Sequence, residues 1–275
     1  HGHDIVLDSV DFTTENKIFL LREPDDLKAI YYNSFATFIA MNDIEENASY
    51  APVNGTFGGT IDFRGHTLTL AYPNNYFIYN LAPSGVIKNI NVRYDKTLDR
   101  GFICDNYGTI QNLVYTVELE SDEYVKQSFI YRNYKTGVIE NFVVKVVGDA
   151  MVYHPNSTRS SVLFVRENYN VIRNGYVYDT NAGGRVYLAN PNIIGNANFG
   201  VLTAANGDSG VIENVYVDLN LATDEKNETP KISSGLITGS NSGRIQNVFG
   251  SARRYSFRYN AEDNVALEVT QDFYS

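Results

Sequence analysis

A short phrase built from apolar, glycine and asparagine positions recurs six times along the chain. Each copy has an isoleucine two positions before a closing asparagine, with a polar residue between them. The closing asparagines are Asn89, Asn112, Asn141, Asn174, Asn214 and Asn247. Repetition at intervals of 23 residues (89 to 112) to 40 residues (174 to 214) indicates stacked units that share one core.

The position four residues before each closing asparagine is glycine in five copies and asparagine in one. These residues are Gly85, Gly108, Gly137, Asn170, Gly210 and Gly243. After glycine, asparagine is the residue that best tolerates a left-handed backbone. The exchange therefore predicts a tight turn with a positive φ at this position.

The alternation of inward and outward side chains slips at each closing asparagine. The isoleucine points inward, yet the residue directly after the asparagine is also apolar in five of the six copies. Side chains of a strand alternate with a period of two, so the slip predicts a corner where the chain bends. Asparagines at equivalent corners are expected to hydrogen-bond from one unit to the next, as amide ladders do.

A second apolar strand precedes each turn, and it too ends near an asparagine. The residues Phe102, Phe129, Phe164, Leu202 and Ile237 lie four positions before Asn106, Asn133, Asn168, Asn206 and Asn241. Each unit is a strand, a glycine turn, a short strand, an asparagine corner, a strand and a variable return loop. This pattern predicts an all-β fold, a right-handed single-stranded parallel β-helix (solenoid) over residues 57–260.

The amino-terminal part is predicted to form a cap over residues 4–56, with a helix at about 24–33 and a strand at about 35–44. Pro24 and two acidic residues mark the start of the helix, and Leu27, Ile30 and Tyr31 share one face. We expect this short α-helix to cover the open apolar end of the β-helix. Residues 1–3 are interpreted as a tag remnant, and residues 261–275 as a segment that continues into a further domain.

One outward position departs from the polar pattern expected of a surface. Two residues past each corner asparagine the chain carries Asn91, Val114, Val143, Tyr176, Tyr216 and Phe249. Stacking would join these side chains into one stripe, widest at Tyr176, Tyr178, Tyr216 and Phe249. We interpret these four as candidate binding residues, because a contiguous apolar surface is either a binding site or covered. The alternative is that the return loop at 185–199 folds over them and makes the stripe part of the core.

The sequence shows no catalytic or metal-binding constellation, so we predict no catalytic residue, no metal site and no cofactor. Glu140 and Arg173 occupy the polar position of neighbouring units and are interpreted as a surface salt bridge. The stretch DFRGH at 62–66 is interpreted as a turn of the capping unit. His154 has no partner nearby in sequence, and NGDSG at 206–210 lacks the alternating acids of a calcium loop.

Composition and charge narrow the possible partners. The net charge of −10 and the absence of a basic stripe argue against nucleic acid and anionic membranes. No run approaches 18 apolar residues, so membrane insertion is not predicted. No signal-peptide pattern stands at the amino end. Cys104 is the only cysteine and lies in an apolar strand context, which favours a packing role.

The recurring phrase resembles the GLUG-type repeats of bacterial surface and secreted proteins, as found beside immunoglobulin A protease-type zinc metallopeptidase domains. The lead-in strengthens the resemblance through EPDDLKAI (23–30), NDI (42–44) and FGGTIDFRGHTLTL (57–70). The likeness covers roughly residues 20–250. The chain departs from it by lacking any H-E-x-x-H motif and by having APSG at 82–85 in place of an asparagine-containing turn.

The resemblance implies a scaffold at an extracellular or cell-surface location. We therefore expect a non-catalytic binding or spacer domain, either adhesin-like or accessory to an immunoglobulin A protease-type metallopeptidase. It would present loops to a host glycan or protein, or carry a neighbouring domain of the same protein. The alternative is a β-helix polysaccharide lyase or glycoside hydrolase, which would need carboxylates aligned on neighbouring units. The oligomeric state stays open.

Overall fold

The computed structural model describes residues 17–47, 53–71, 76–96, 100–119, 124–153, 162–180, 184–189, 197–224, 232–252, 254–260 and 265–271. Strands make up most of this part of the chain. Its helical residues are a 3-10 turn, η2 (Pro24–Leu27), and the one-turn helix α1 (Lys28–Tyr32).

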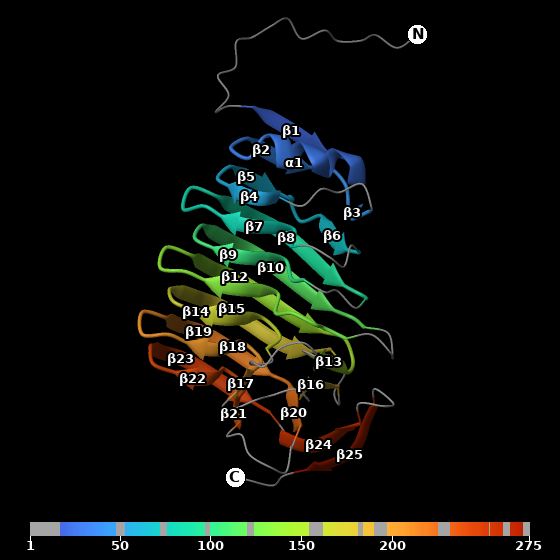
Figure 1. Cartoon of the computed structure of the whole chain (residues 1–275), viewed down its shortest axis with the longest axis vertical. Helices are drawn as coiled ribbons and strands as arrows, with labels where there is room; N and C mark the ends of the chain where they lie inside the picture. Colours follow the sequence, from blue (N-terminus) through green and yellow to red (C-terminus); the bar gives the residue numbers. More distant parts are fainter. Residues whose placement is uncertain are drawn as a thin grey trace, which may run out of the picture.

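A long parallel sheet, sheet A, runs along the whole rod (Figure 1). Its strands, in order of hydrogen bonding, are β1 (Ile18–Leu21), β2 (Thr37–Ala40), β5 (Thr60–Asp62), β8 (Val86–Tyr94), β10 (Thr109–Val117), β12 (Val138–Val146), β15 (Val171–Asp179), β19 (Val211–Asp218) and β23 (Arg244–Ser251). Two short strands, β3 (Ile44–Glu45) and β6 (Thr67–Leu70), extend the sheet beside β8.

A second parallel sheet, sheet B, stacks the strand that precedes each turn. It contains β4 (Val53–Phe57), β7 (Ile78–Leu81), β9 (Ile103–Asn106), β11 (Ile130–Asn133), β14 (Val165–Asn168), β18 (Thr203–Asn206) and β22 (Thr238–Asn241). The chain passes from a strand of sheet B through a turn into sheet A and then returns to sheet B one level further on. The parallel β-helix prediction is therefore confirmed.

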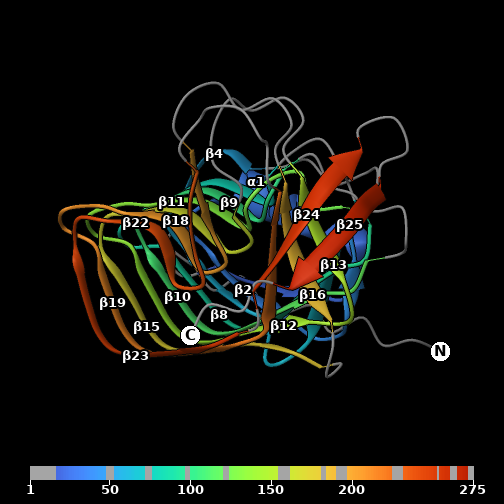
Figure 2. The same ribbon diagram turned by 90° about the horizontal axis from the view of Figure 1, so that it is seen from below.

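The return segments carry strands that the repeated phrase did not predict. Sheet C consists of β13 (Ala150–Tyr153), β16 (Arg185–Ala189), β20 (Asn220–Asp224), β24 (Arg254–Asn260) and β25 (Val265–Gln271), and sheet D pairs β17 (Ala197–Gly200) with β21 (Ile232–Gly235). Strand β25 is antiparallel to β24, whereas the other strand pairings found in the described residues are parallel. Seen along the rod, sheet C forms a further side of the coil (Figure 2).

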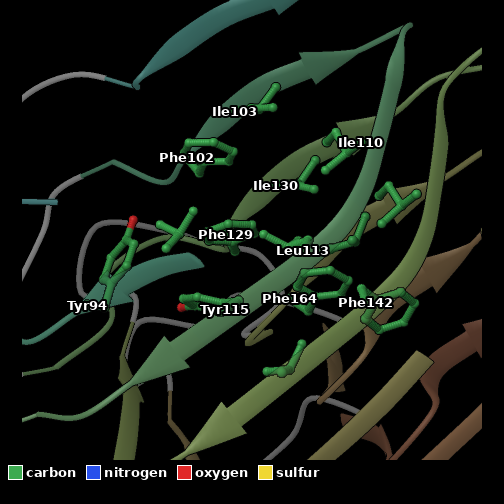
Figure 3. Packing of buried hydrophobic residues seen from close by; sticks show 14 of the residues in the cluster. Tyr94, Phe102, Ile103, Ile110, Leu113, Tyr115, Phe129, Ile130, Phe142 and Phe164 are labelled. Carbon is green, nitrogen blue, oxygen red and sulfur yellow. The ribbon is translucent and has the colours of Figure 1, made fainter. Parts of the chain in front are cut away.

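Phenylalanines from successive levels stack inside the coil. The ring centroids of Phe77 and Phe102 lie 5.3 Å apart, those of Phe102 and Phe129 5.0 Å, and those of Phe129 and Phe164 5.7 Å. The four rings are buried. Figure 3 shows Phe102, Phe129 and Phe164 together with Tyr115, whose ring packs against that of Phe129 with the centroids 4.0 Å apart. Each buried ring of this size contributes about 1.5–3 kcal/mol of transfer free energy, so the inward positions hold the levels together.

The six closing asparagines form the predicted corner and ladder, and they lie within the long strands of sheet A. Each has a left-handed backbone with φ between 50° and 57°. Each side-chain amide after the first donates to the oxygen of the asparagine one level earlier, over 2.8 to 3.3 Å. We call this the outer ladder; it begins at Asp62, whose carboxylate accepts from Asn89 at 3.0 Å.

The turn glycines do not have the positive φ predicted from their exchange with Asn170. They are required because the turns stack closely: a Cβ at Gly137 would lie 2.4 Å from the carbonyl oxygen of Asn106. Asn170 itself points its side-chain amide at the carbonyl of Gly137, 3.0 Å away. The prediction of a tight turn was right, but it placed the left-handed residue at the glycine instead of the corner asparagine.

A second ladder lies inside the coil at the ends of the sheet B strands. The amide of Asn106 donates to Asn133 at 2.7 Å, and the series continues through Asn168 and Asn206 to Asn241 at 2.8 Å per step. We call this the inner ladder. Its first four members are buried, and its hydrogen bonds point toward later levels, opposite to those of the outer ladder.

The turns between sheets B and A alternate between two lengths. Short turns follow Phe57, Asn106, Asn168 and Asn241, and turns two residues longer follow Leu81, Asn133 and Asn206. Each long turn has a serine or threonine before its glycine, and that hydroxyl donates to a carbonyl of the preceding short turn. The bonds are Ser84 to Gly58 at 3.0 Å, Thr136 to Tyr107 at 2.7 Å, and Ser209 to Tyr169 at 2.7 Å. The structural repeat is therefore a pair of levels.

The amino-terminal cap contains the predicted helix and strand with different bounds. The helical region is shorter than 24–33 and divided between η2 and α1, and the strand expected at 35–44 is β2 followed by β3. Leu27 and Ile30 are buried as predicted, but Tyr31 is 45% exposed and does not share their face. Strands β1 and β2 continue sheet A beyond β5, so the cap extends the same sheet.

Candidate functional site

The outward position two residues past each corner forms a column across sheet A. Parallel pairing places Asn91 beside Val114, Val114 beside Val143, and Val143 beside Tyr176. The column continues with Tyr216 and Phe249 on β19 and β23. Register alone therefore brings together the side chains that the sequence predicted as a stripe.

The aromatic end of this column is open to solvent. Tyr176 is 37% exposed, Tyr216 41% and Phe249 68%, while Tyr178 is half-buried. The ring of Tyr176 stacks on that of Tyr178 at 4.8 Å and lies 5.4 Å from that of Tyr216. We call Tyr176, Tyr178, Tyr216 and Phe249 the aromatic stripe.

The return loop at 185–199 does not make the aromatic stripe part of the core. Its described residues form β16 of sheet C and β17 of sheet D instead. The three large exposed rings show that no described segment of the chain covers them. For the residues that the structure describes, the hypothesis of a covered stripe is therefore wrong; residues 190–196 of the loop lie outside them. The exposed rings form a contiguous apolar patch of a kind that is uncommon on protein surfaces.

Charged side chains border the aromatic stripe. Lys145 and Asp218 are the partners of Tyr178 on β12 and β19. Partial loss of hydration raises the pKa of the Tyr176 hydroxyl, and the negative charge of Asp218 raises it further. The hydroxyl of Tyr176 is therefore neutral at physiological pH and can both donate and accept a hydrogen bond.

A flat row of tyrosine and phenylalanine rings can bind a partner without catalysing a reaction. Such rings offer large apolar faces with little conformational entropy to lose, and tyrosine adds a hydroxyl at the edge. Stacking contacts of this kind suit the apolar face of a sugar ring or an aromatic-rich protein surface. The arrangement is thus suited to recognition.

Sheet B carries a polar cluster that sequence reasoning missed. Arg132 binds Asp105 with two nitrogen–oxygen contacts of 2.8 and 3.2 Å. Its guanidinium also lies 5.2 Å and 5.1 Å from the ring centroids of Tyr131 and Tyr134. The sign of charge alternates along the slot from Asp105 through Arg132 to Glu167, and this alternation is the signal that the sequence contained.

The Arg132–Asp105 pair links neighbouring levels of sheet B. Partial burial alone would lower the pKa of Arg132, but the hydrogen bonds and charge of Asp105 hold that pKa above its ordinary value. Arg132 also separates Asp105 from Glu167, so these two carboxylates do not flank an open gap as a glycosidase pair would.

The other candidates from the sequence have structural partners. Arg173 binds Glu140 with nitrogen–oxygen distances of 2.9 and 2.6 Å, as the salt-bridge interpretation predicted. In DFRGH, Asp62 begins the outer ladder, whereas His66 lies 3.3 Å from Asp43. The acid and the histidine of that stretch therefore have separate partners.

NGDSG at 206–210 is one of the long turns, in which Asp208 accepts from the backbone N–H of Ser209 at 2.9 Å. No group of three or more His, Cys, Asp or Glu suited to a metal occurs among the residues that the structure describes. Cys104 is a free, buried thiol whose pKa is raised by burial. Residues 1–3 and His154 lie outside the described ranges.

The helices of the described segments are all too short to span a bilayer. A scan against protein-family models, a search of curated proteins and a search of solved structures each find no match to this chain.

Proposed function

We propose that the chain is a non-catalytic binding domain that uses the aromatic stripe to contact a glycan or protein. The observation that carries the proposal is the exposure of Tyr176, Tyr216 and Phe249 in one stacked column. On β15 and β19 the inward side chains are buried, among them Ile172, Val177 and Ile212, so these two levels do not need the outward tyrosines for their core.

The resemblance to GLUG-type repeats supports an extracellular or cell-surface setting of adhesin or metallopeptidase-accessory type. In that setting the partner is a host glycan, a host protein or a neighbouring domain. The net charge of −10 and the mixed charges beside the stripe favour a neutral or weakly charged partner over a polyanion.

The test replaces Tyr176 and Tyr216 with serine and measures binding to a panel of immobilised neutral and acidic glycans and glycoproteins. We expect any binding shown by the natural chain to weaken at least about tenfold, with a melting temperature within about 2 °C. The matched control replaces the exposed Tyr31 and Tyr32 at the opposite end and should leave binding unchanged. Equal losses in both double variants would contradict the role of the stripe.

The enzyme alternative is tested with the same protein. Uronate and neutral polysaccharides are incubated with the natural chain and assayed for unsaturated or reducing sugar. We expect release at the background rate. Release above background that disappears in Asp105→Asn or Arg132→Gln would overturn the binding proposal in favour of catalysis at the sheet B cluster.

A further inference from the structure

The last level of the coil leaves its interior open. Ile245 of β23 is 37% exposed, while its five counterparts on earlier levels (Ile87, Ile110, Ile139, Ile172 and Ile212) are fully buried. Ile237 and Leu236 are half-buried, whereas Leu202 and Val201 one level earlier are fully buried. We call Leu236, Ile237, Asn241, Ser242, Ile245 and Asn247 the end face.

The end face also has free strand edges. In the described part of the chain, β23 pairs only with β19 and β22 pairs only with β18. Each strand therefore presents a row of backbone donors and acceptors on its outer side. Such an edge is a template for a further parallel strand.

At the end face, the outer ladder ends in a side-chain oxygen that can accept a hydrogen bond, and the inner ladder ends in an amide that can donate one. Asn247 donates to Asn214, so its side-chain oxygen faces outward, and no described residue donates to that oxygen. Asn241 accepts from Asn206, and its amide reaches only the carbonyl of Gly243 in its own turn, at 3.3 Å. The end face therefore requires a donor at the outer corner and an acceptor at the inner corner, and an asparagine at each supplies both.

The alternation of turns specifies the missing level further. The turn between β22 and β23 is short, and each short turn between earlier levels is followed by a long turn whose serine or threonine donates to its backbone. The next level should therefore have a long turn, with its hydroxyl donating to the carbonyl of Ser242. Residues 200–218 of this chain, GVLTAANGDSGVIENVYVD, are such a level.

Among the described residues, the segments that follow β23 do not extend sheets A and B. After β23 the chain enters β24 of sheet C, and β25 turns back antiparallel to β24. A second copy meeting the end face through a two-fold axis would run its strands antiparallel, so the stacked corner asparagines would lose their register. The opposite end of the rod offers β1, which has no asparagine for either ladder.

We propose that the end face is a docking site for one long-turn level supplied by a partner polypeptide. The partner adds one strand to sheet B and one to sheet A, with an asparagine at the end of the first and a second asparagine at the corner. It has serine or threonine before the glycine of its turn. This surface is separate from the aromatic stripe except at the last level, where Phe249 lies on the outer side of β23.

The experiment titrates the full chain into a fluorescein-labelled peptide of residues 200–218 and follows fluorescence anisotropy. The comparison peptide is the chain's own short-turn level, residues 235–251. We expect the long-turn peptide to bind at least about tenfold more tightly than the short-turn peptide. Replacing the serine of the long-turn peptide that corresponds to Ser209 with alanine should weaken the binding of this peptide to the chain.

Ile245→Lys in the full chain should reduce peptide binding at least about tenfold, because it places a charge in the apolar centre of the end face. The matched control is Ile18→Lys, which puts the same substitution on the exposed β1 at the other end. Circular dichroism checks that both variants are folded.

Three results would overturn the proposal. The first is an unchanged anisotropy up to about 1 mM chain, which sets the weakest affinity of interest. The second is equal affinity for the long-turn and short-turn peptides. The third is a dimer in sedimentation equilibrium that Ile245→Lys dissociates, since a second copy would then occupy the end face.

Discussion

The side-chain amide of Asn89 donates a hydrogen bond to the carboxylate of Asp62 over 3.0 Å, and with this contact the outer ladder begins. The backbone N–H of Arg64 donates to the same oxygen at 2.9 Å, and Lys88 lies 3.5 Å from the other. The first residue of this ladder must accept a hydrogen bond from Asn89, and it has no earlier asparagine to which it could donate one. The carboxylate of Asp62 thus starts the ladder; an amide in its place would have an N–H₂ group facing away from the asparagines.

Because of Asp62, the stability of the amino-terminal levels should decrease at acidic pH. Partial burial alone would raise the pKa of Asp62, but the hydrogen bonds from Asn89 and Arg64 and the charge of Lys88 together hold the pKa below its ordinary value. A lowered folded-state pKa gives stability that is fully present above the unfolded value of about 3.9 and is lost as pH falls through the folded value. Urea unfolding at pH 7 and near pH 2.5 should therefore show a larger difference for the natural chain than for Asp62→Asn. Identical pH profiles would mean that the carboxylate does not contribute.

The corner asparagines combine two roles that substitutions can separate. Asn141 has a φ of 54°, donates a hydrogen bond to Asn112 at 3.3 Å and accepts one from Asn174 at 3.2 Å. Asn141→Ala loses the hydrogen bonds and strains the left-handed backbone, whereas Asn141→Gly loses only the hydrogen bonds. We expect alanine to cost about 1–2 kcal/mol more than glycine in the free energy of unfolding, measured in urea. Equal costs would show that the backbone conformation is not what selects asparagine here.

The parallel β-helix could be predicted from the sequence because stacking repeats one environment at every level. Ile110 and Ile139 face the same core and Asn112 and Asn141 the same ladder, so like residues recur at like positions. The left-handed residue was misassigned because glycine is selected both by positive φ and by close backbone approach. A pattern of glycines cannot distinguish these two causes. The lack of space for a Cβ at Gly137 shows that close backbone approach is the cause here.

The rest of the structure depended on contacts that a repeat does not encode. Strands β13, β16 and β20 lie in return segments of different length and composition, so no phrase marked them. The column with Tyr176 and Tyr216 followed from the register, but its exposure depended on where a distant loop folds. The inner ladder was visible as a row of asparagines, and only the structure shows that its members bond to one another.

The inner ladder should be sensitive to charge. Asn133 is buried, accepts from Asn106 at 2.7 Å and donates to Asn168 at 2.8 Å. Asn133→Asp puts an oxygen where a donor stood, facing the oxygen of Asn168. Burial of the new carboxyl should raise its pKa above about 3.9, so the variant loses stability as pH rises from that value through the raised one.

We expect Asn133→Asp to cost several kcal/mol at pH 8, on the order of 3–5, and clearly less near pH 4.5. The control is Asn133→Leu, which copies the residue that stands at the equivalent position two levels earlier, Leu81, and should show a cost that does not change with pH. Urea unfolding at the two pH values measures both. A pH-independent cost for the aspartate variant would contradict a buried ionisable group at this site.

The exception in the core column at Gly175 is explained by Phe142. The residue after the corner is apolar in the other levels, but a Cβ at Gly175 would lie 2.0 Å from the ring of Phe142. The large ring on β12 thus fills the space of two levels. We expect Gly175→Val alone and Phe142→Val alone each to destabilise the chain by about 2–4 kcal/mol, the first by overpacking and the second by leaving a cavity.

The double variant Phe142→Val with Gly175→Val should be more stable than the sum of the single changes predicts, by at least about 1 kcal/mol, because the new valine occupies the vacated space. Urea unfolding of the four proteins closes the cycle. The control pairs Phe142→Val with Gly55→Ala, where a Cβ meets open space, and these effects should add. Additivity in both cycles would show that the glycine is not there to accommodate the ring.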